Sequence, residues 1–301
     1  MNERASTEAL ARMGSSQTGQ AEPSDTAPDR QAPLEEGSLA QSRSDPSLLN
    51  SLHHWYEVVR ELVTRDHKAR YKNTGMGVLW AVASPLLFLL TFYTIFGVVM
   101  RVNIPNYASF VFTGIVAWNW LQTSLSEGVT SISQNASLVA HPGFPLQALP
   151  MVSVVSNLLN FCFALPILLG VALIEHGGLG WTILFLPLVM AVQFVFILSF
   201  AYFVSAANVT FRDVQYILPV LLQLGYFTTP IFYDLRQAPD AIQPILQLNP
   251  MAQIIGAYRA VLSGDAPNFA ALAAVLAVSG VLLILGYRYF RNSAEHFLEE
   301  I

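Results

Sequence analysis

The sequence predicts an all-α polytopic membrane protein, and its composition, its charge placement and the length of its apolar segments support this prediction together. Apolar residues make up 53% of the 301 residues and charged residues only 12%, about half the charged share of soluble globular proteins. Residues 177–211 carry no charge at all, and a soluble protein displaying such a surface would aggregate. The composition therefore excludes a soluble enzyme, a nucleic-acid binder and a secreted disulfide scaffold. The single cysteine, Cys162, also excludes an intramolecular disulfide.

The N-terminal segment 1–50 is predicted to be a disordered cytoplasmic tail. Its first 47 residues contain no Phe, Trp, Tyr, Val or Ile, so they cannot bury enough apolar surface to offset the entropy lost on ordering. A solvated tail without a specific role is the preferred interpretation. A tether or a partner-binding tail is the alternative.

Residues 51–73 are predicted to form an amphipathic helix in the membrane interface. Its apolar residues recur at helical spacing, with charged residues between them; they are Leu52, Trp55, Val59, Leu62 and Val63. A helix of this kind directly before a membrane span belongs in the interface plane. The alternative is a short helix packed on a neighbouring element.

Residues 74–291 are predicted to form a domain with six transmembrane helices, because a membrane span needs about 20 mainly apolar residues. The six qualifying stretches are 78–100, 107–126, 151–174, 181–208, 214–233 and 269–287. The segment 242–258 is apolar but is broken by Pro244, Asn249 and Pro250. It therefore predicts short re-entrant helices before the last span, and residues 292–301 follow as a cytoplasmic C-terminal tail.

The distribution of Lys and Arg predicts the orientation of the chain. With six spans, twelve of the fifteen basic residues fall on the side of the two termini and three on the other. Because basic residues concentrate on the cytoplasmic side, both termini are expected in the cytoplasm.

The chain carries no sequence signature for hydrolysing ATP itself. A phosphate-binding loop needs a lysine directly after glycine, whereas Lys68 follows His67 and Lys72 follows Tyr71. The six acids between residues 76 and 291 all fall at predicted helix ends or in loops, so no mid-membrane proton carrier is expected. The histidines are scattered, and no metal site is predicted. The energy for any transport is therefore expected from a partner.

Several motifs occur in order between residues 50 and 291. The first comprises Arg65, Asp66, Arg70, Tyr71, Thr74, Gly77, Trp80 and Pro85, and the second comprises Asn135, Ala136, Leu138, Val139, Phe144, Pro145 and Pro150. The third is the run 208–213, followed by Pro219, the run 229–233, Asn249-Pro250 and Tyr258-Arg259. This ordered set resembles the membrane-spanning permease subunits of ABC transporters that export polysaccharides such as O-antigen, capsule and teichoic acid.

The resemblance implies a permease that exports a lipid-linked polysaccharide across the bacterial inner membrane. It implies a homodimer with two ATP-binding cassette subunits that hold ATP and Mg, so this chain itself would be no enzyme and would bind no cofactor. The lipid-linked glycan and membrane lipids would be its other partners, and nucleic acid would not. A permease for a drug or small lipid is one alternative. A membrane-embedded glycosyl- or acyltransferase is another, although no paired catalytic constellation is present.

Two groups of residues are expected to meet the cargo. Arg65, Arg70, Tyr71 and Lys72 would bind the lipid-linked pyrophosphate at the cytoplasmic entrance, because arginine binds phosphate oxygens in pairs; positive-inside anchoring explains them equally well. The aromatic residues expected to line the channel are Tyr93, Trp118, Trp120, Tyr226, Phe227, Phe232 and Tyr233. An interfacial aromatic belt is the alternative for most of them.

The loop between the second and third predicted spans, residues 127–150, is expected to couple the permease to its ATPase. The coupling residues are Asn135, Leu138, Val139, His141, Phe144 and Pro145. Ser and Asn residues in the loop can cap a short helix, and Leu138, Val139 and Phe144 are expected to form an exposed apolar edge. In the fifth span, Asp213 is expected to cap the helix at its N-terminus.

Overall fold

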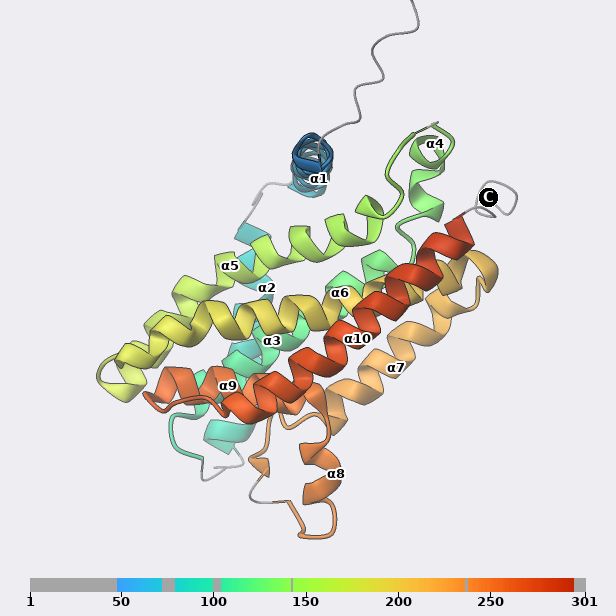
Figure 1. Cartoon of the computed structure of the whole chain (residues 1–301). Helices are drawn as coiled ribbons and strands as arrows, with labels where there is room; N and C mark the ends of the chain where they lie inside the picture. Colours follow the sequence, from blue (N-terminus) through green and yellow to red (C-terminus); the bar gives the residue numbers. More distant parts are fainter. Residues whose placement is uncertain (1–47, 72–78, 100–103, 142, 236–237, 295–301) are drawn as a thin grey trace, which may run out of the picture. The chain divides into compact units, whose positions relative to one another are not determined.

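The computed structural model of the protein describes residues 48–71, 79–99, 104–141, 143–235 and 238–294. All regular elements in these ranges are helices, which confirms the all-α prediction for the described part of the chain (Figure 1). The predicted N-terminal tail lies outside the described residues up to residue 47, as do Lys72 and the C-terminal tail from residue 295.

Each predicted span corresponds to a helix that begins within three residues of the expected position. These helices are α2 (Leu79–Phe92) with the π-helix η1 (Tyr93–Val99), α3 (Tyr107–Gly128), α5 (Ala148–His176), η3 (Trp181–Phe185) with α6 (Leu186–Thr210), α7 (Val214–Thr228) and α10 (Phe269–Ala294). Among the described residues, three helices are long and apolar enough to cross a membrane: α5, the continuous helix Trp181–Thr210, and α10. The helices Ala83–Val99 and Val214–Thr228 are apolar but shorter.

The helix α7 ends five residues earlier than the sequence predicted, at Thr228 instead of residue 233. Thr229 is extended, with ψ 137°, because it precedes Pro230 and the proline ring disfavours a helical conformation at the preceding residue. The amide of Thr229 still donates to the Gly225 carbonyl at 2.9 Å. The chain therefore leaves the helix in an ordered turn.

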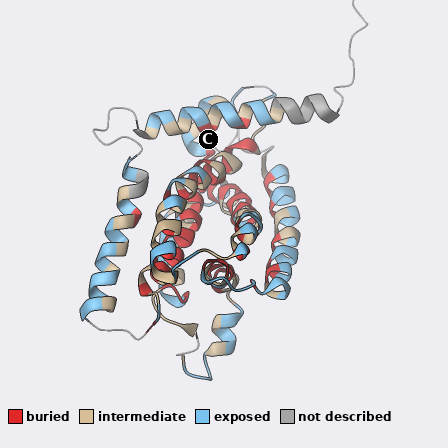
Figure 2. Cartoon of the chain, turned by 90° about the vertical axis from the view of Figure 1, so that its left-hand side faces the viewer, coloured by how far each residue is buried: buried red, intermediate tan, exposed pale blue. Residues whose placement is uncertain are grey.

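The core of the described region surrounds α3. Residues 111–118 of this helix are buried on every side, and α3 contacts α2, α5, α6, α7 and α9. Buried residues gather where these helices meet (Figure 2). The helices α6 and α10 pack closely along their length, and Gly286 of α10 lies against the Phe203 ring and the Ser199 carbonyl of α6.

The segment expected to be re-entrant forms two short helices, α8 (Gln243–Gln247) and α9 (Pro250–Ser263), with a break at Asn249. The Asn249 side chain accepts a hydrogen bond from the Met251 amide at 2.9 Å, which caps α9, and Pro250 occupies the first helical position, where a missing amide costs nothing. Ile254 and Ile255 are fully buried, so α9 is part of the core.

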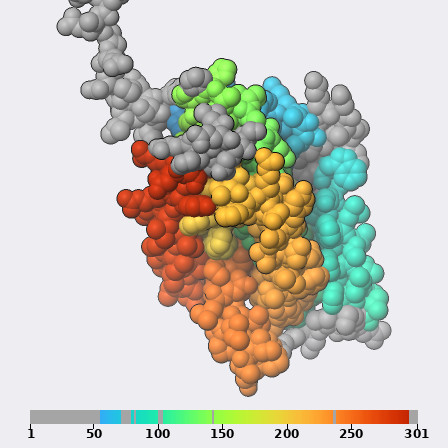
Figure 3. Space-filling view, turned by 90° about the vertical axis from the view of Figure 1, so that its right-hand side faces the viewer, coloured from blue at the N-terminus to red at the C-terminus, as the bar shows by residue number. Residues whose placement is uncertain are grey.

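Two helices present large apolar side chains at the surface. On α7 these include Ile217, Val220 and Leu224, and on α10 Val281 and Ile284. Figure 3 shows α7 in gold and α10 in red on one face of the molecule. An apolar surface of this extent needs lipid or another protein to cover it.

Candidate functional site

The helix α1 (Leu48–Tyr71) rests on α5 through its apolar side. Val59 and Val63 are buried and form a small cluster with Ala148. The His67 ring lies 3.0 Å from the Ser156 carbonyl oxygen. These contacts match the alternative of a helix packed on its neighbour, and the interfacial position of α1 stays a prediction.

The charged side of α1 reaches the end of α3. The Arg70 guanidinium donates from both terminal nitrogens to the two carboxylate oxygens of Glu127, and its Nε donates to Asp66 at 2.9 Å. Burial alone would lower the pKa of Arg70, but the hydrogen bonds to Glu127 and Asp66 outweigh it and raise that pKa above its ordinary value. Arg70 is therefore a permanently charged group held by two acids.

Glu127 is also held by α5. The Asn157 Nδ2 donates to the same carboxylate and to the Ser153 carbonyl oxygen at 2.9 Å. The Arg70–Glu127 pair thus joins α1, α3 and α5, and only about a quarter of the Arg70 side chain is exposed.

Around this pair lies a pocket of about 390 Å³, between α1, the end of α3 and the start of α5; we call it the entrance pocket after the role predicted for its arginines. Both Arg65 and Arg70 line it, together with Asp66, Glu127 and Asn135. Arg65 is exposed and donates to the Asn135 side-chain oxygen at 3.0 Å. The structure therefore brings together the two arginines that were predicted to bind phosphate. Lys72 and the side chain of Tyr71 lie outside the described residues.

The expected coupling loop contains the short helical segments η2 (Ser133–Asn135) and α4 (Ala136–Val139). Asn135 stands at the N-cap position of α4, but its side chain makes no cap hydrogen bond. Its Nδ2 donates to the Ser131 carbonyl at 2.8 Å, while its oxygen accepts from Arg65. Asn135 therefore connects the loop to α1 and, although Asn residues of the loop could cap a short helix, it does not cap α4.

The expected apolar edge of this loop is largely covered by the chain itself. Val139 is 4% exposed, and Leu138 and Phe144 are partly buried against the core. Val139 therefore does not belong to an exposed edge, because its side chain is part of the core cluster. The exposed residues are polar or small, among them Ser137 and His141, and Pro145 is partly buried.

Some of the predicted channel aromatics form one group beside α7. The Phe232 ring stacks on Phe92 at 4.2 Å and meets Tyr226 edge-on at 5.2 Å. Tyr226 in turn contacts Trp118. Tyr93 and Phe227 are exposed.

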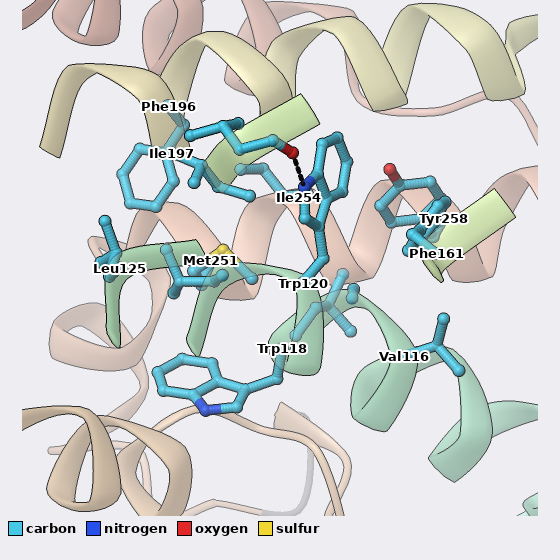
Figure 4. Packing of buried hydrophobic residues seen from close by; sticks show 14 of the residues in the cluster. Val116, Trp118, Trp120, Leu125, Phe161, Phe196, Ile197, Met251, Ile254 and Tyr258 are labelled. Atoms are coloured by element: carbon cyan, nitrogen blue, oxygen red, sulfur yellow. Dashed lines mark hydrogen bonds between the residues drawn. The ribbon is translucent and has the colours of Figure 1, made fainter. Parts of the chain in front are cut away.

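Trp120 has a different place from Trp118, although both are on α3 (Figure 4). It is 2% exposed, packs on Phe161 and donates to the Val154 carbonyl at 3.2 Å. It belongs to the core that joins α3 to α5, and its place in a channel wall stays a prediction. The Tyr233 hydroxyl donates to the Thr228 carbonyl and stabilises the turn after α7.

At the opposite end, where α3 begins and α5 ends, there is a cavity of about 540 Å³. Arg259 of α9 lies within it, 3.3 Å above the centre of the Phe110 ring. Its nitrogens donate to the carbonyls of Phe110, Pro230 and Ile231. Arg259 therefore fixes the turn after α7 to α3, and each of its three nitrogens donates to a backbone carbonyl.

Three polar residues gained roles that the sequence analysis did not assign. Glu127 and Asn157 complete the Arg70 site. At the start of α7, the Asn208 side chain accepts from the Gln215 amide at 3.1 Å, and Asp213, which was expected to cap this helix, makes no side-chain cap bond. The predicted cap at Asp213 is therefore wrong. Asn157 carried a usable signal, since a polar residue inside an apolar membrane segment marks a protein-facing contact.

Long apolar helices around a buried core, with a charged pocket at one end, define a polytopic membrane protein. The chain belongs to the ABC-2 type transporter family, whose profile matches residues 57–263. Members of this family are membrane subunits of transporters.

Curated relatives cover most of the chain. It is 37% identical over 257 residues to the O-antigen export system permease protein RfbA of Myxococcus xanthus, which covers 84% of this chain and 99% of the relative. The O-antigen export system permease protein RfbA of Klebsiella pneumoniae is 29% identical, over 83% of this chain and 96% of its own length. The polysialic acid transport protein KpsM of Escherichia coli is 26% identical, over 80% and 95%. The resemblance to polysaccharide-export permeases is confirmed.

Proposed function

We propose that this chain is the transmembrane permease subunit of an ATP-driven exporter that moves a lipid-linked polysaccharide across the bacterial inner membrane. The observation that carries the proposal is the similarity to an O-antigen export permease over 99% of that relative's length. The proposal includes six spans with both termini in the cytoplasm, α1 in the interface, and α8 and α9 as re-entrant helices. The positive-inside count and the helix positions support this arrangement.

The exporter would be a homodimer of this chain with two ATP-binding cassette subunits that hold ATP and Mg. The lack of a phosphate-binding loop supports a separate ATPase. The exposed apolar side chains of α7 offer a surface for a second copy or for lipid.

The entrance pocket would receive the pyrophosphate that links the glycan to its lipid carrier. Arg65 and Arg70 line this pocket together, and Tyr71 and Lys72 directly follow them in the sequence. Arginine suits this role because its planar group binds two phosphate oxygens at once. The aromatic group around Phe232 would then lie along the path of the glycan.

The loop with α4 would transmit force from the ATPase. Its exposed residues Ser137 and His141 would contact the partner directly, together with the exposed parts of Leu138 and Phe144. Asn135 supports this role, because its hydrogen bond from Arg65 connects the loop to the entrance pocket.

Co-expression with a candidate ATP-binding cassette subunit from the same organism, followed by affinity purification, tests the proposal. We expect equal amounts of the two proteins, and transport of the glycan into vesicles that requires ATP. Replacing Arg65 and Arg70 together by Gln should reduce transport while the protein still inserts. A chain that purifies without an ATPase and shows transferase activity on its own would refute the proposed function.

A further inference from the structure

In the entrance pocket, the Arg70 guanidinium already donates hydrogen bonds to two carboxylates. Both oxygens of the Glu127 carboxylate accept from its two terminal nitrogens, and Asp66 accepts from its Nε. Paired acceptance by two oxygens of one group is also the way in which phosphate binds arginine. The Glu127 carboxylate therefore takes the place that a phosphate group would need on Arg70.

Glu127 is held in this position from a second helix. Asn157 donates to its carboxylate and is itself fixed by the Ser153 carbonyl at 2.9 Å and by the Asn160 side chain at 3.1 Å. The contact is thus part of an ordered network between α1, α3 and α5. About a third of the Glu127 side chain is exposed, so an incoming anion can reach the pair from the pocket.

Arg65 differs from Arg70 in this respect. It is exposed, and in the pocket it donates a hydrogen bond to the neutral side chain of Asn135, at 3.0 Å. A neutral partner is easier to replace than a carboxylate, because it offers no attraction between opposite charges. An anion that enters the pocket would therefore meet Arg65 first and compete with Glu127 for Arg70 second.

This competition separates anions by charge. The cytoplasmic leaflet is rich in anionic phospholipids, and a phosphodiester headgroup carries the same single charge as the Glu127 carboxylate. Exchanging one for the other gains no Coulomb energy, whereas a pyrophosphate carries at least two charges and gains attraction to both arginines. An arginine without Glu127 would bind the abundant headgroups.

We propose that Glu127 is a specificity-determining residue of the entrance pocket: it occupies Arg70 against singly charged phospholipid headgroups and yields to a pyrophosphate. This inference rests on the proposed function, because it assumes that the pocket receives the lipid-linked pyrophosphate. It adds the selection step, which makes loading of the permease depend on the number of charges on the ligand.

The test measures binding of radiolabelled farnesyl pyrophosphate to the full-length chain in nanodiscs by equilibrium dialysis. One set of nanodiscs contains phosphatidylcholine alone, and the other an equimolar mixture with phosphatidylglycerol. Inorganic pyrophosphate serves as a competitor, to separate recognition of the pyrophosphate from recognition of the lipid chain. The variants are Glu127→Gln, Asn157→Ala, Arg70→Gln and Glu61→Gln. Glu61 is an exposed residue of α1 outside the pocket, and its replacement changes the charge by the same amount as Glu127→Gln.

For the native chain we expect similar affinities in the two kinds of nanodisc. Glu127→Gln should bind farnesyl pyrophosphate about two- to fivefold more tightly in phosphatidylcholine, because a partly exposed ion pair no longer has to be broken. It should lose this gain when phosphatidylglycerol is present. Glu61→Gln should behave like the native chain, and Asn157→Ala should shift binding in the same direction as Glu127→Gln, by less.

Equal binding by Glu127→Gln and the native chain, with weaker binding by Arg70→Gln, would overturn this inference and leave the proposed phosphate entrance standing. Weaker binding by a folded Glu127→Gln would also overturn it, since Glu127 would then only position Arg70. If neither the native chain nor any variant binds farnesyl pyrophosphate, the phosphate entrance itself is refuted, and the selection step with it.

Discussion

Gly286 provides a sharp test of the packing between α6 and α10. A Cβ added there would lie 2.9 Å from the Phe203 ring and 3.0 Å from the Ser199 carbonyl oxygen. Alanine stabilises a helix by about 1 kcal/mol relative to glycine, but overpacking costs about 1–3 kcal/mol. Because the Ser199 carbonyl belongs to the backbone and cannot rotate away, we expect the upper part of that range. Gly286→Ala should lower the free energy of unfolding by about 1–2 kcal/mol.

The assay is thermal unfolding of the purified protein in one detergent, where a loss of this size lowers Tm by about 5 °C. Gly280→Ala is the matched control in the same helix, because a Cβ there has no heavy atom within 4 Å. It should keep the helix-propensity gain and raise Tm by about 2–4 °C. Equal shifts in the same direction for the two variants would refute the close packing of α10 on α6.

Three further predictions concern other contacts. Arg259→Lys should lower the unfolding free energy by about 3 kcal/mol, because lysine cannot bond all three backbone carbonyls at once; an unchanged Tm would contradict the clamp on the turn after α7. Val139→Asp should prevent recovery of folded protein by burying an unpaired charge, which costs about 3 kcal/mol or more. Ser137→Asp, on the exposed side of the same short helix, should fold normally and weaken co-purification of the ATPase; equal yields of the two variants would be inconsistent with the burial of α4. Phe232→Ala should reduce export of the glycan to the cell surface more than Phe227→Ala, since the Phe232 ring joins Phe92 to Tyr226, whereas the exposed Phe227 ring meets Tyr226 from the edge of the group; the reverse order would count against a path along it.

The positions of the helices could be predicted from the sequence because they depend on local chemistry. Apolar runs located the helices that correspond to the predicted spans, amphipathic spacing located α1, and Asn249 with Pro250 marked the break before α9. The end of α7 was misplaced in the sequence analysis, although it also depends on local chemistry, since Pro230 ends α7 at Thr228. The sequence analysis correctly used the prolines of segment 242–258 as breaks, but it overlooked Pro230 inside an apolar run.

The contacts of the polar residues could not be predicted in the same way. Asp213 and Asn135 both stand at N-cap positions without side-chain cap bonds. Near Asp213, the Gln215 amide donates to Asn208 instead. The Asn135 side-chain oxygen accepts from the distant Arg65. Glu127 looked like a residue at a helix end, whereas packing brings it to Arg70, 57 positions away in the chain. Such pairings depend on how α1, α3 and α5 meet, which no local pattern encodes.

The burial of aromatic and apolar side chains was less predictable than the positions of the helices and more predictable than the contacts of the polar residues. Trp118 and Trp120 are two positions apart, and the sequence analysis predicted the same role for both. In the structure they lie on different sides of α3, and both are buried: Trp120 packs on Phe161 and Trp118 meets Tyr226. Helix orientation, set by the neighbours of α3, decides which partners each ring meets.

The central claim is that this chain exports a lipid-linked polysaccharide, and the most direct measurement is the location of that polysaccharide in cells that lack the chain. Surface labelling of the glycan and extraction of its lipid-linked form would be compared between the deletion strain and the strain complemented with the native gene. We predict that the deletion strain loses the surface glycan and accumulates the lipid-linked form inside, and that complementation restores export. Normal surface glycan in the deletion strain, without internal accumulation, would contradict the account.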